Sequence, residues 1–285
     1  LKTKNLKLND PNRILPNQKT DLHALGVLIY MYLLRRHPLR GGKIWDLDSE
    51  KDELLAMGEK ALFIEHPTDK TNRVKISQLR KWDDFWGNPD LLSYKITGPY
   101  LSELFEQVFV QGLHDPIKRP IANAWEIALL KTVDLIQPCS NPKCEEKWYV
   151  FDNTSKPKCP FCGTFHQGSL PIADLYYKFK DDVWKPENHR LMVYNNQYLF
   201  KWHVSRKVIR NESLSAEDKL PVGYFTFYNN KWVLVNQTLS GMKDLTADKE
   251  VPVNSMVELT HGKKLLLSNE EGGRILYISL TNQST

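Results

Sequence analysis

Long apolar runs are missing from this sequence, and their absence restricts what the protein can be. The longest run, residues 20–34, has about fifteen residues, whereas a helix that crosses a bilayer needs about 20. No stretch has the basic start, short apolar centre and small-residue cleavage site of a secretory signal peptide. We therefore expect a chain that does not cross a membrane and works in the cytoplasm.

A strong excess of one charge is also missing. The chain of 285 residues has 39 Lys and Arg against 34 Asp and Glu, which gives a net charge of +5. An excess this small, spread along the chain, does not by itself indicate a nucleic-acid partner. The length allows two or three domains. Because the chain opens at Leu1 in a polar stretch, we expect a segment of a longer protein.

Cysteine is scarce as well, but its four copies lie close together. They occur as Cys139-x4-Cys144 and, fourteen residues later, as Cys159-x2-Cys162. Two such pairs brought together by the fold can surround one tetrahedral zinc ion, and Gly163 allows the second pair a tight turn. Four thiolates fill the coordination shell of zinc, so the sequence predicts a structural zinc ribbon rather than a catalytic centre.

Alternatives remain open for this cluster. The four cysteines could be free or joined in disulfides, although their clustering and the absence of a secretory signal favour a metal. His166 could replace one thiolate, but a lone surface histidine is the simpler interpretation. Because about thirty residues cannot build a hydrophobic core, the metal is expected to hold this module together.

The residues before the cysteines have helical periodicity. The run 20–34 is apolar on every side of a helical wheel, which predicts a buried central helix capped by Thr20 or Asp21. Apolar residues at spacings of three and four predict three further helices, over residues 48–63, 100–111 and 122–136.

From about residue 188 onward, the apolar period falls from 3.6 to 2, which predicts strands. Asn195-Asn196 and Asn229-Asn230 each separate two such strands, and asparagine tolerates the positive φ of a tight hairpin turn. The expected fold class is therefore a multidomain chain, α and then β. Its parts are a helical lobe (1–137), a four-cysteine zinc ribbon (138–168), a linker (169–187) and an all-β sandwich (188–285).

Two segments of the helical half have a distinctive order. Residues 20–26 read TDLHALG before an apolar run, and residues 113–120 read LHDPIKRP before the last helix. In this order and at roughly this spacing, they resemble the C-terminal lobe of protein kinases, and the resemblance covers residues 1–137. It implies that Asp21 anchors the backbone of a catalytic loop and that Arg119 pairs with a buried glutamate, which lies outside this sequence or is replaced by another carboxylate. The simpler alternatives are a helix cap for Asp21 and a surface position for Arg119.

The motifs of an active kinase are absent from the sequence. There is no Gly-rich loop, no H-R-D-x-x-x-x-N and no D-F-G, and the DFWG at residues 84–87 has an extra residue and follows the central helix. We therefore expect a pseudokinase-like chain without catalytic activity. A longer parent chain could still be a Ser/Thr protein kinase.

The whole chain carries a narrower resemblance. A kinase-like lobe, a zinc ribbon and a β-domain occur in series, with LLAMGEKALFIEHPTDKTNR at residues 54–73 between the two kinase-like segments. This arrangement resembles the kinase-like member of the bacterial tellurite-resistance-associated TerY phosphorylation triad. The resemblance implies a von Willebrand A partner, whose Mg²⁺ an acidic residue of this chain could help to coordinate. It also implies a PP2C-type phosphatase in the same stress-response system.

Three functions are compatible with these features. The first is a non-catalytic scaffold that binds a protein, with Trp82 and Trp86 as anchors if they are exposed rather than in the core. The second is the docking half of an active Ser/Thr kinase. The third is nucleic-acid binding by the zinc ribbon, which is disfavoured because few basic or aromatic residues flank the cysteines.

One short segment of the β-module resembles a recognition motif. Ser205-Arg206 is similar to the Ser-Arg of FHA domains, which read phosphothreonine. The later His and the preceding Gly-Arg of that pattern are absent, so an unliganded β-module used for protein contact is the expectation.

Overall fold

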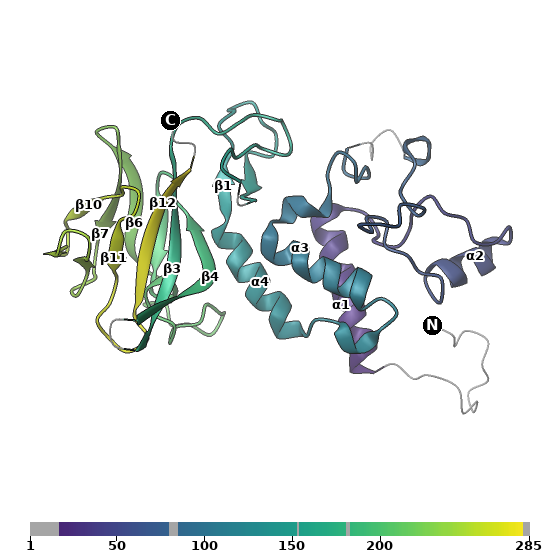
Figure 1. Cartoon of the computed structure of the whole chain (residues 1–285), viewed down its shortest axis with the longest axis horizontal. Coiled ribbons are helices and arrows are strands. Elements are labelled where there is room, and N and C mark those ends of the chain that lie inside the picture. The colour runs from purple at the N-terminus through teal and green to yellow at the C-terminus, as the bar shows by residue number, and fades with distance from the viewer. Residues whose placement is uncertain (1–16, 80–84, 153, 181–182, 282–285) are drawn as a thin grey trace. The chain divides into compact units, whose positions relative to one another are not determined.

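The computed structural model describes residues 17–79, 85–152, 154–180 and 183–281, and every structural statement below concerns these residues. The chain forms two compact units, Leu1–Thr132 and Val133–Thr285. Five α-helices and three antiparallel sheets are present within the described ranges (Figure 1). The expected order of helices and then strands holds only coarsely, because a short helix, α5 (Lys201–Val204), lies among the strands. No helix of the described ranges is long and apolar enough to cross a membrane.

The first unit is built on helix α1 (Gln18–Leu34), which begins earlier than predicted. The side chain of Asn17 accepts hydrogen bonds from the backbone N–H groups of Lys19 and Thr20. The hydroxyl of Thr20 accepts in turn from the N–H of Asn17, so two donors at the helix start are satisfied. The cap is therefore Asn17, and the prediction of Thr20 or Asp21 as the cap was wrong.

Helix α1 is also less buried than its composition suggests. Tyr30 and Leu34 are completely buried, but Leu28 and Tyr32 are 55% and 85% exposed. The ring of Tyr30 meets three phenylalanine rings at centroid distances of 5.2 to 5.7 Å. These rings lie on one side only, and a helix that packs on one side buries only one stripe of its residues. The prediction of a helix buried on all sides was therefore wrong.

The remaining helices before the sheets follow the periodicity of the sequence, and the last two residues of α4 belong to the second unit. Helix α2 is shorter than the predicted 48–63, while α3 continues into a π-helical turn that together with it covers the predicted 100–111. The bounds are α2 (Ser49–Ala56), α3 (Pro99–Glu106), the π turn (Gln107–Gln111) and α4 (Ala122–Asp134). Three short 3-10 turns are Ile76–Gln78, Tyr94–Thr97 and Pro116–Lys118.

A buried ion pair joins two parts of the long connection after α1, and Tyr30 joins this pair to the helix. The guanidinium of Arg36 lies 2.6 Å from Glu65, and both side chains are almost completely buried. Arg36 also donates to the carbonyl oxygens of Trp86 and Leu92, at 2.7 and 2.6 Å. The hydroxyl of Tyr30 donates to Glu65. Burial, followed by the charge of Glu65, raises the pKa of Tyr30 well above its usual value, so this phenol stays a donor.

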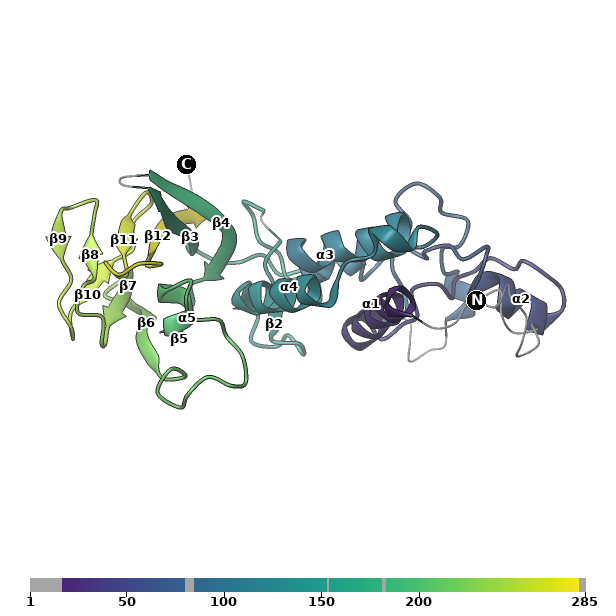
Figure 2. The ribbon, with the colours of Figure 1, turned by 90° about the horizontal axis from the view of Figure 1, so that it is seen from below.

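The second unit contains the three antiparallel sheets. A two-stranded sheet pairs β1 (Ile136–Pro138) with β2 (Trp148–Val150). The four-stranded sheet has the order β10 (Met256–Glu258), β7 (Lys231–Asn236), β6 (Pro221–Tyr228), β5 (Gln197–Phe200). The six-stranded sheet has the order β4 (Val183–Met192), β3 (Leu170–Lys180), β12 (Arg274–Thr281), β11 (Lys264–Leu266), β8 (Lys243–Asp244), β9 (Lys249–Glu250). Both ribbon views show β3 beside β4 (Figure 2).

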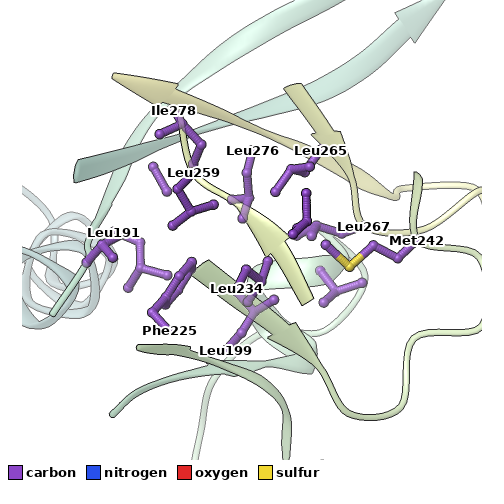
Figure 3. Close-up of a cluster of buried hydrophobic side chains, with 14 of the residues drawn as sticks. Leu191, Leu199, Phe225, Leu234, Met242, Leu259, Leu265, Leu267, Leu276 and Ile278 are labelled. Carbon is purple, nitrogen blue, oxygen red and sulfur yellow. The ribbon is translucent and has the colours of Figure 1, made fainter. Parts of the chain in front are cut away.

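The two larger sheets share one hydrophobic core. Leu276 and Leu265 of the six-stranded sheet lie in the same buried cluster as Phe225 and Leu234 of the four-stranded sheet (Figure 3). Each of these side chains is completely buried. Because side chains alternate across a strand, the other face of each sheet points away from this core.

Two predictions for this unit were wrong. The expected linker 169–187 contains β3 and the first half of β4, because its run LPIADLYY supplies side chains that are buried within the sheet. Asn195-Asn196 does not close a hairpin, since β4 before it pairs with β3 and β5 after it pairs with β6. In contrast, Asn229-Asn230 closes the hairpin β6–β7, and both residues have positive φ values, 49° and 60°.

Candidate metal centre

The first pair of cysteines lies on the hairpin of β1 and β2. Pro138 and Trp148 are paired across these strands, and the loop between them carries Cys139 and Cys144. The N–H of Cys139 donates to the carbonyl of Lys147 at 2.7 Å, which closes the loop. The N–H of Asn141 donates to the sulfur of Cys139 at 3.4 Å. The sequence therefore forms a knuckle in which a backbone N–H faces a thiol.

The second pair forms a tighter turn. The N–H of Gly163 donates to the carbonyl of Cys159 at 2.9 Å, and Lys158 and Phe165 form a bridge that closes the loop. Gly163 has a φ of +74°, and a Cβ there would meet nothing closer than 3.6 Å. The backbone angle, rather than lack of space, therefore requires glycine, as its position in the sequence predicts.

The two knuckles bring the four thiols together. The Sγ atoms of all four cysteines lie within 4.8 Å of one another, an arrangement that could hold a metal ion. The sulfur atoms of Cys139 and Cys162 are 3.5 Å apart, and those of Cys144 and Cys159 are 3.9 Å apart. Both separations exceed the ~2.05 Å of a disulfide. They lie close to the ~3.8 Å expected between thiolates at ~2.3 Å from a tetrahedral zinc ion.

The electrostatics of the four thiols differ. Burial raises the pKa of Cys159 to about 12 and also raises that of Cys139. The hydroxyl of Thr164, 3.3 Å from the sulfur of Cys162, lowers the pKa of this exposed thiol to about 6. Because the thiolate is the form of cysteine that binds a metal ion, the lowered pKa of Cys162 suits it to this role.

The module has very little hydrophobic core of its own. The buried members of its cluster are Cys144, Tyr149 and Cys159, against which Cys139 and Phe161 pack. Three buried side chains cannot offset the entropy of ordering a loop of this length. The ligand cluster is thus the main group that can hold the two knuckles to one another.

His166 lies near the cluster but outside the group of four. Its Nδ1 atom is 3.4 Å from the hydroxyl of Ser140, and its backbone N–H donates to Pro157. Burial lowers its pKa. The imidazole is half-buried rather than on the surface, and it joins the second knuckle to the first.

The two positions that the kinase resemblance singles out, Asp21 and Arg119, lie at the start of α1 and in the loop before α4. Asp21 is exposed in the first turn of α1, where its charge suits the positive end of the helix. Arg119 donates to the carbonyl oxygens of Gly112, Lys19 and Leu113, at 2.7 to 3.1 Å. No carboxylate of the described residues forms an ion pair with Arg119. Within this chain, Arg119 joins the start of α1 to the loop before α4 through backbone carbonyl groups.

The two predicted tryptophan anchors have separate outcomes. Trp82 lies outside the described residues. Trp86 is half-buried, and the guanidinium of Arg35 lies over its ring at 4.4 Å. The indole therefore has a partner within its own unit.

A second polar cluster was not predicted. Asp134 is buried, with one carboxylate oxygen 2.6 Å from His189 and the other 3.4 Å from His203. Burial alone would raise the pKa of Asp134, but the charge and hydrogen bonds of the two histidines outweigh it and hold this pKa far below its usual value. The three residues are far apart in the sequence, so no local spacing reveals them.

The segment that resembles an FHA motif is engaged within the fold. Arg206 lies 2.9 Å from Glu187, and its guanidinium stacks over Tyr177 at 3.9 Å. Glu187 also accepts from Arg274, at 2.7 Å. The hydroxyl of Ser205 accepts from the N–H of Lys207, at 3.2 Å. Both side chains of the segment thus contact groups of their own unit.

Comparison with known proteins adds little to this description. No family model matches the sequence, and no curated protein matches it either. Among solved structures, full-length yeast Pml1p is similar over 40% of this chain and 84% of its own length, at 15% identity and a TM-score of 0.27.

Proposed function

We propose that this chain is a non-catalytic protein-interaction scaffold whose cysteine module is held by a structural zinc ion. The observation that carries the proposal is the gathering of four thiols within 4.8 Å. Thiolate ligands select soft cations such as zinc, and four of them leave no open position for a substrate or a water nucleophile. The role of the metal is therefore to join the knuckles.

Metal analysis of the purified chain tests the zinc assignment. One zinc per chain is expected, and replacement by Co²⁺ should give the visible absorption of tetrahedral thiolate cobalt. Cys159→Ser should lower the metal content strongly, while Ser140→Ala, beside the cluster, should keep it. A chain without metal, or a Cys159→Ser chain that keeps it, contradicts the assignment.

The scaffold role is supported by an apolar row on α1. Leu28, Met31 and Tyr32 are 55%, 42% and 85% exposed, more than a helix of this composition normally leaves to solvent. Together with the resemblance to the kinase-like member of the TerY triad, this row leads us to propose a von Willebrand A protein as the partner. The PP2C-type phosphatase of such a system would act on the same complex.

Binding measurements with the von Willebrand A protein of the same gene neighbourhood test this role. Calorimetry should show a complex that Tyr32→Ser weakens and that Ile76→Ser, at an apolar side chain 70% exposed elsewhere in the unit, does not. The same measurement in EDTA tests the role of the partner's Mg²⁺, provided that zinc analysis shows the cysteine site still loaded. A loss of affinity under these conditions would indicate that the Mg²⁺ takes part in binding. ATP binding by this chain would instead favour an active kinase half.

A further inference from the structure

The outer face of the six-stranded sheet carries a hollow of about 390 Å³. It is lined by Tyr176, Trp184, Lys264, Ile275 and Tyr277, from strands β3, β4, β11 and β12. Tyr176 is paired with Ile275, and Tyr277 with Lys264, so these side chains share one face of the sheet. The neighbouring residues Leu175 and Leu276 point to the opposite face and belong to the core. The hollow therefore lies on the far side of the sheet from the core.

Three aromatic rings form the walls of this hollow. The rings of Tyr176 and Tyr277 meet edge to face, with centroids 6.1 Å apart. Trp184 comes from the adjacent strand, and buried Ile275 forms the floor. Within the described residues, neither phenol hydroxyl nor the indole N–H has a hydrogen-bond partner. The hollow thus combines flat apolar surfaces with polar atoms that are open to a ligand.

The charge at the rim selects the class of ligand. Lys264 is exposed, and no carboxylate of the described residues pairs with it. Its ammonium disfavours the cationic ligands that aromatic cages otherwise bind. A sugar would need acceptors for its many hydroxyl donors, and the lining contains no carboxylate or amide side chain. An anion that carries a planar ring fits both the rings and the charge.

A larger hollow in the same unit lacks this combination. It has a volume of about 780 Å³ and includes Lys231 and Glu258 in its lining. The ammonium of Lys231 lies 2.8 Å from Glu258, so its charge is already neutralised. Of these two hollows, the smaller is the one in which aromatic rings and an unpaired cation occur together.

We propose that the hollow on the outer face of the six-stranded sheet binds single-stranded nucleic acid, with one base between the aromatic rings and a backbone phosphate on Lys264. Base stacking on aromatic side chains tolerates every sequence, because each base presents a π-face. A strand lying along the open sheet can continue from this hollow across the same face of the paired strands β3, β12 and β11. The site is separate from the cysteine module and does not depend on the protein partner proposed above.

Fluorescence anisotropy with a labelled fifteen-nucleotide dT or rU strand tests the proposal on the intact, zinc-loaded chain. At 50 mM salt we expect saturable binding with a dissociation constant of roughly 1–100 µM, which weakens as salt rises. Tyr277→Ala and Trp184→Ala should each weaken binding roughly tenfold, since a stacked base contributes about 1–3 kcal/mol. Lys264→Glu should weaken binding. It should also reduce the slope of log affinity against log salt concentration by about one, because one contact with a phosphate is lost.

The matched controls are Tyr198→Ala, an exposed tyrosine on the other sheet, and Lys249→Glu, an exposed lysine on β9. Both should bind like the unchanged chain, and thermal unfolding should show that all variants fold. Using Tyr277 and Trp184 separately guards against the failure of either variant to fold. No saturable binding at about 200 µM protein and low salt overturns the proposal. Equal losses of affinity in the test and control variants also overturn it. If a mononucleotide competes as strongly as the oligonucleotide, the proposal is likewise wrong, and the hollow is a site for free nucleotides.

Discussion

The cysteine module and the two-sheet core belong to the same unit but are held together by different means. Among the described residues, the shared core of the sheets contains seventeen buried hydrophobic residues, whereas the cluster of the module contains three, two of them cysteines. Burial of apolar surface can stabilise the first without help. The cysteine module has too few apolar groups to be stabilised in this way, and its candidate stabiliser is a metal ion bound by its four sulfur atoms. The comparison shows that a module too small to form a hydrophobic core can be stabilised by side chains that bind a metal ion instead.

Removal of the metal should have the largest effect on stability, and it should affect the cysteine module and not the sheets. Structural zinc sites contribute about 10–16 kcal/mol of apparent binding free energy, so Cys159→Ser or chelation should unfold the module. Amide hydrogen exchange should show lost protection at Cys159 and Gly163, with protection at Leu234 and Leu276 unchanged. Simultaneous loss of protection in the sheets would show that the two regions are not independent.

The reverse change should weaken the sheets and leave the metal in place. Leu234 is completely buried in the shared core, so Leu234→Ala should lower the free energy of unfolding by about 2–5 kcal/mol. Val253→Ala, at a site 41% exposed, should change it by less than about 0.5 kcal/mol. Denaturant titration with parallel zinc analysis measures both. A lower zinc content in folded Leu234→Ala would show that the metal site depends on the core of the sheets.

Acid should weaken the second unit through Asp134. Because its pKa is lower in the folded chain than the usual aspartate value of 3.8, its contribution is fully present above pH 3.8 and is lost as the pH falls below that value. Asp134→Asn should therefore cost on the order of 1–3 kcal/mol at pH 6 and progressively less toward pH 2.5. Thermal unfolding of both chains across this range provides the measurement. A constant difference would mean that the carboxylate charge is not what stabilises the unit.

The smallest effect is expected at a hairpin turn that uses neither core nor metal. Asn230 has a φ of 60°, and a residue with an ordinary Cβ loses about 1 kcal/mol in adopting it. Asn230→Ala should therefore lower the free energy of unfolding by about 1 kcal/mol, while Asn230→Gly should leave it nearly unchanged. Equal effects of the two substitutions would show that the side chain, not the backbone angle, is required.

The cysteine spacing was the most informative feature of the sequence, because metal ligands are few in kind and their knuckles are short. The helices around 100–111 and 122–136 were also predictable, since their apolar period is local. The two Asn-Asn pairs show the limit of such reasoning. Both carry the same turn preference, but only Asn229-Asn230 has strands on either side that pair with each other. Strand pairing is decided by contacts between distant segments.

The same limit applies to α1 and to Asp134. The apolar run 20–34 could not reveal that partners would lie on only one side of the helix, because those partners come from distant residues such as Phe105 and Phe109. Asp134 meets its histidines only after β4 and α5 have folded onto the end of α4. The spacing of residues in the sequence cannot predict features that depend on tertiary contacts. It can predict features that depend on a loop of a few residues.

The ion pair of Arg36 has a consequence for how the helical unit loses its structure. One guanidinium bonds to Glu65 and to the carbonyl groups of Trp86 and Leu92, three separate stretches of the connection that follows α1. The bonds to Glu65 and Leu92 are buried and the bond to Trp86 is partly buried, so detaching any of these stretches leaves a charge or a dipole without a partner. The connection should therefore melt in a single cooperative step together with the helix, rather than fray piece by piece.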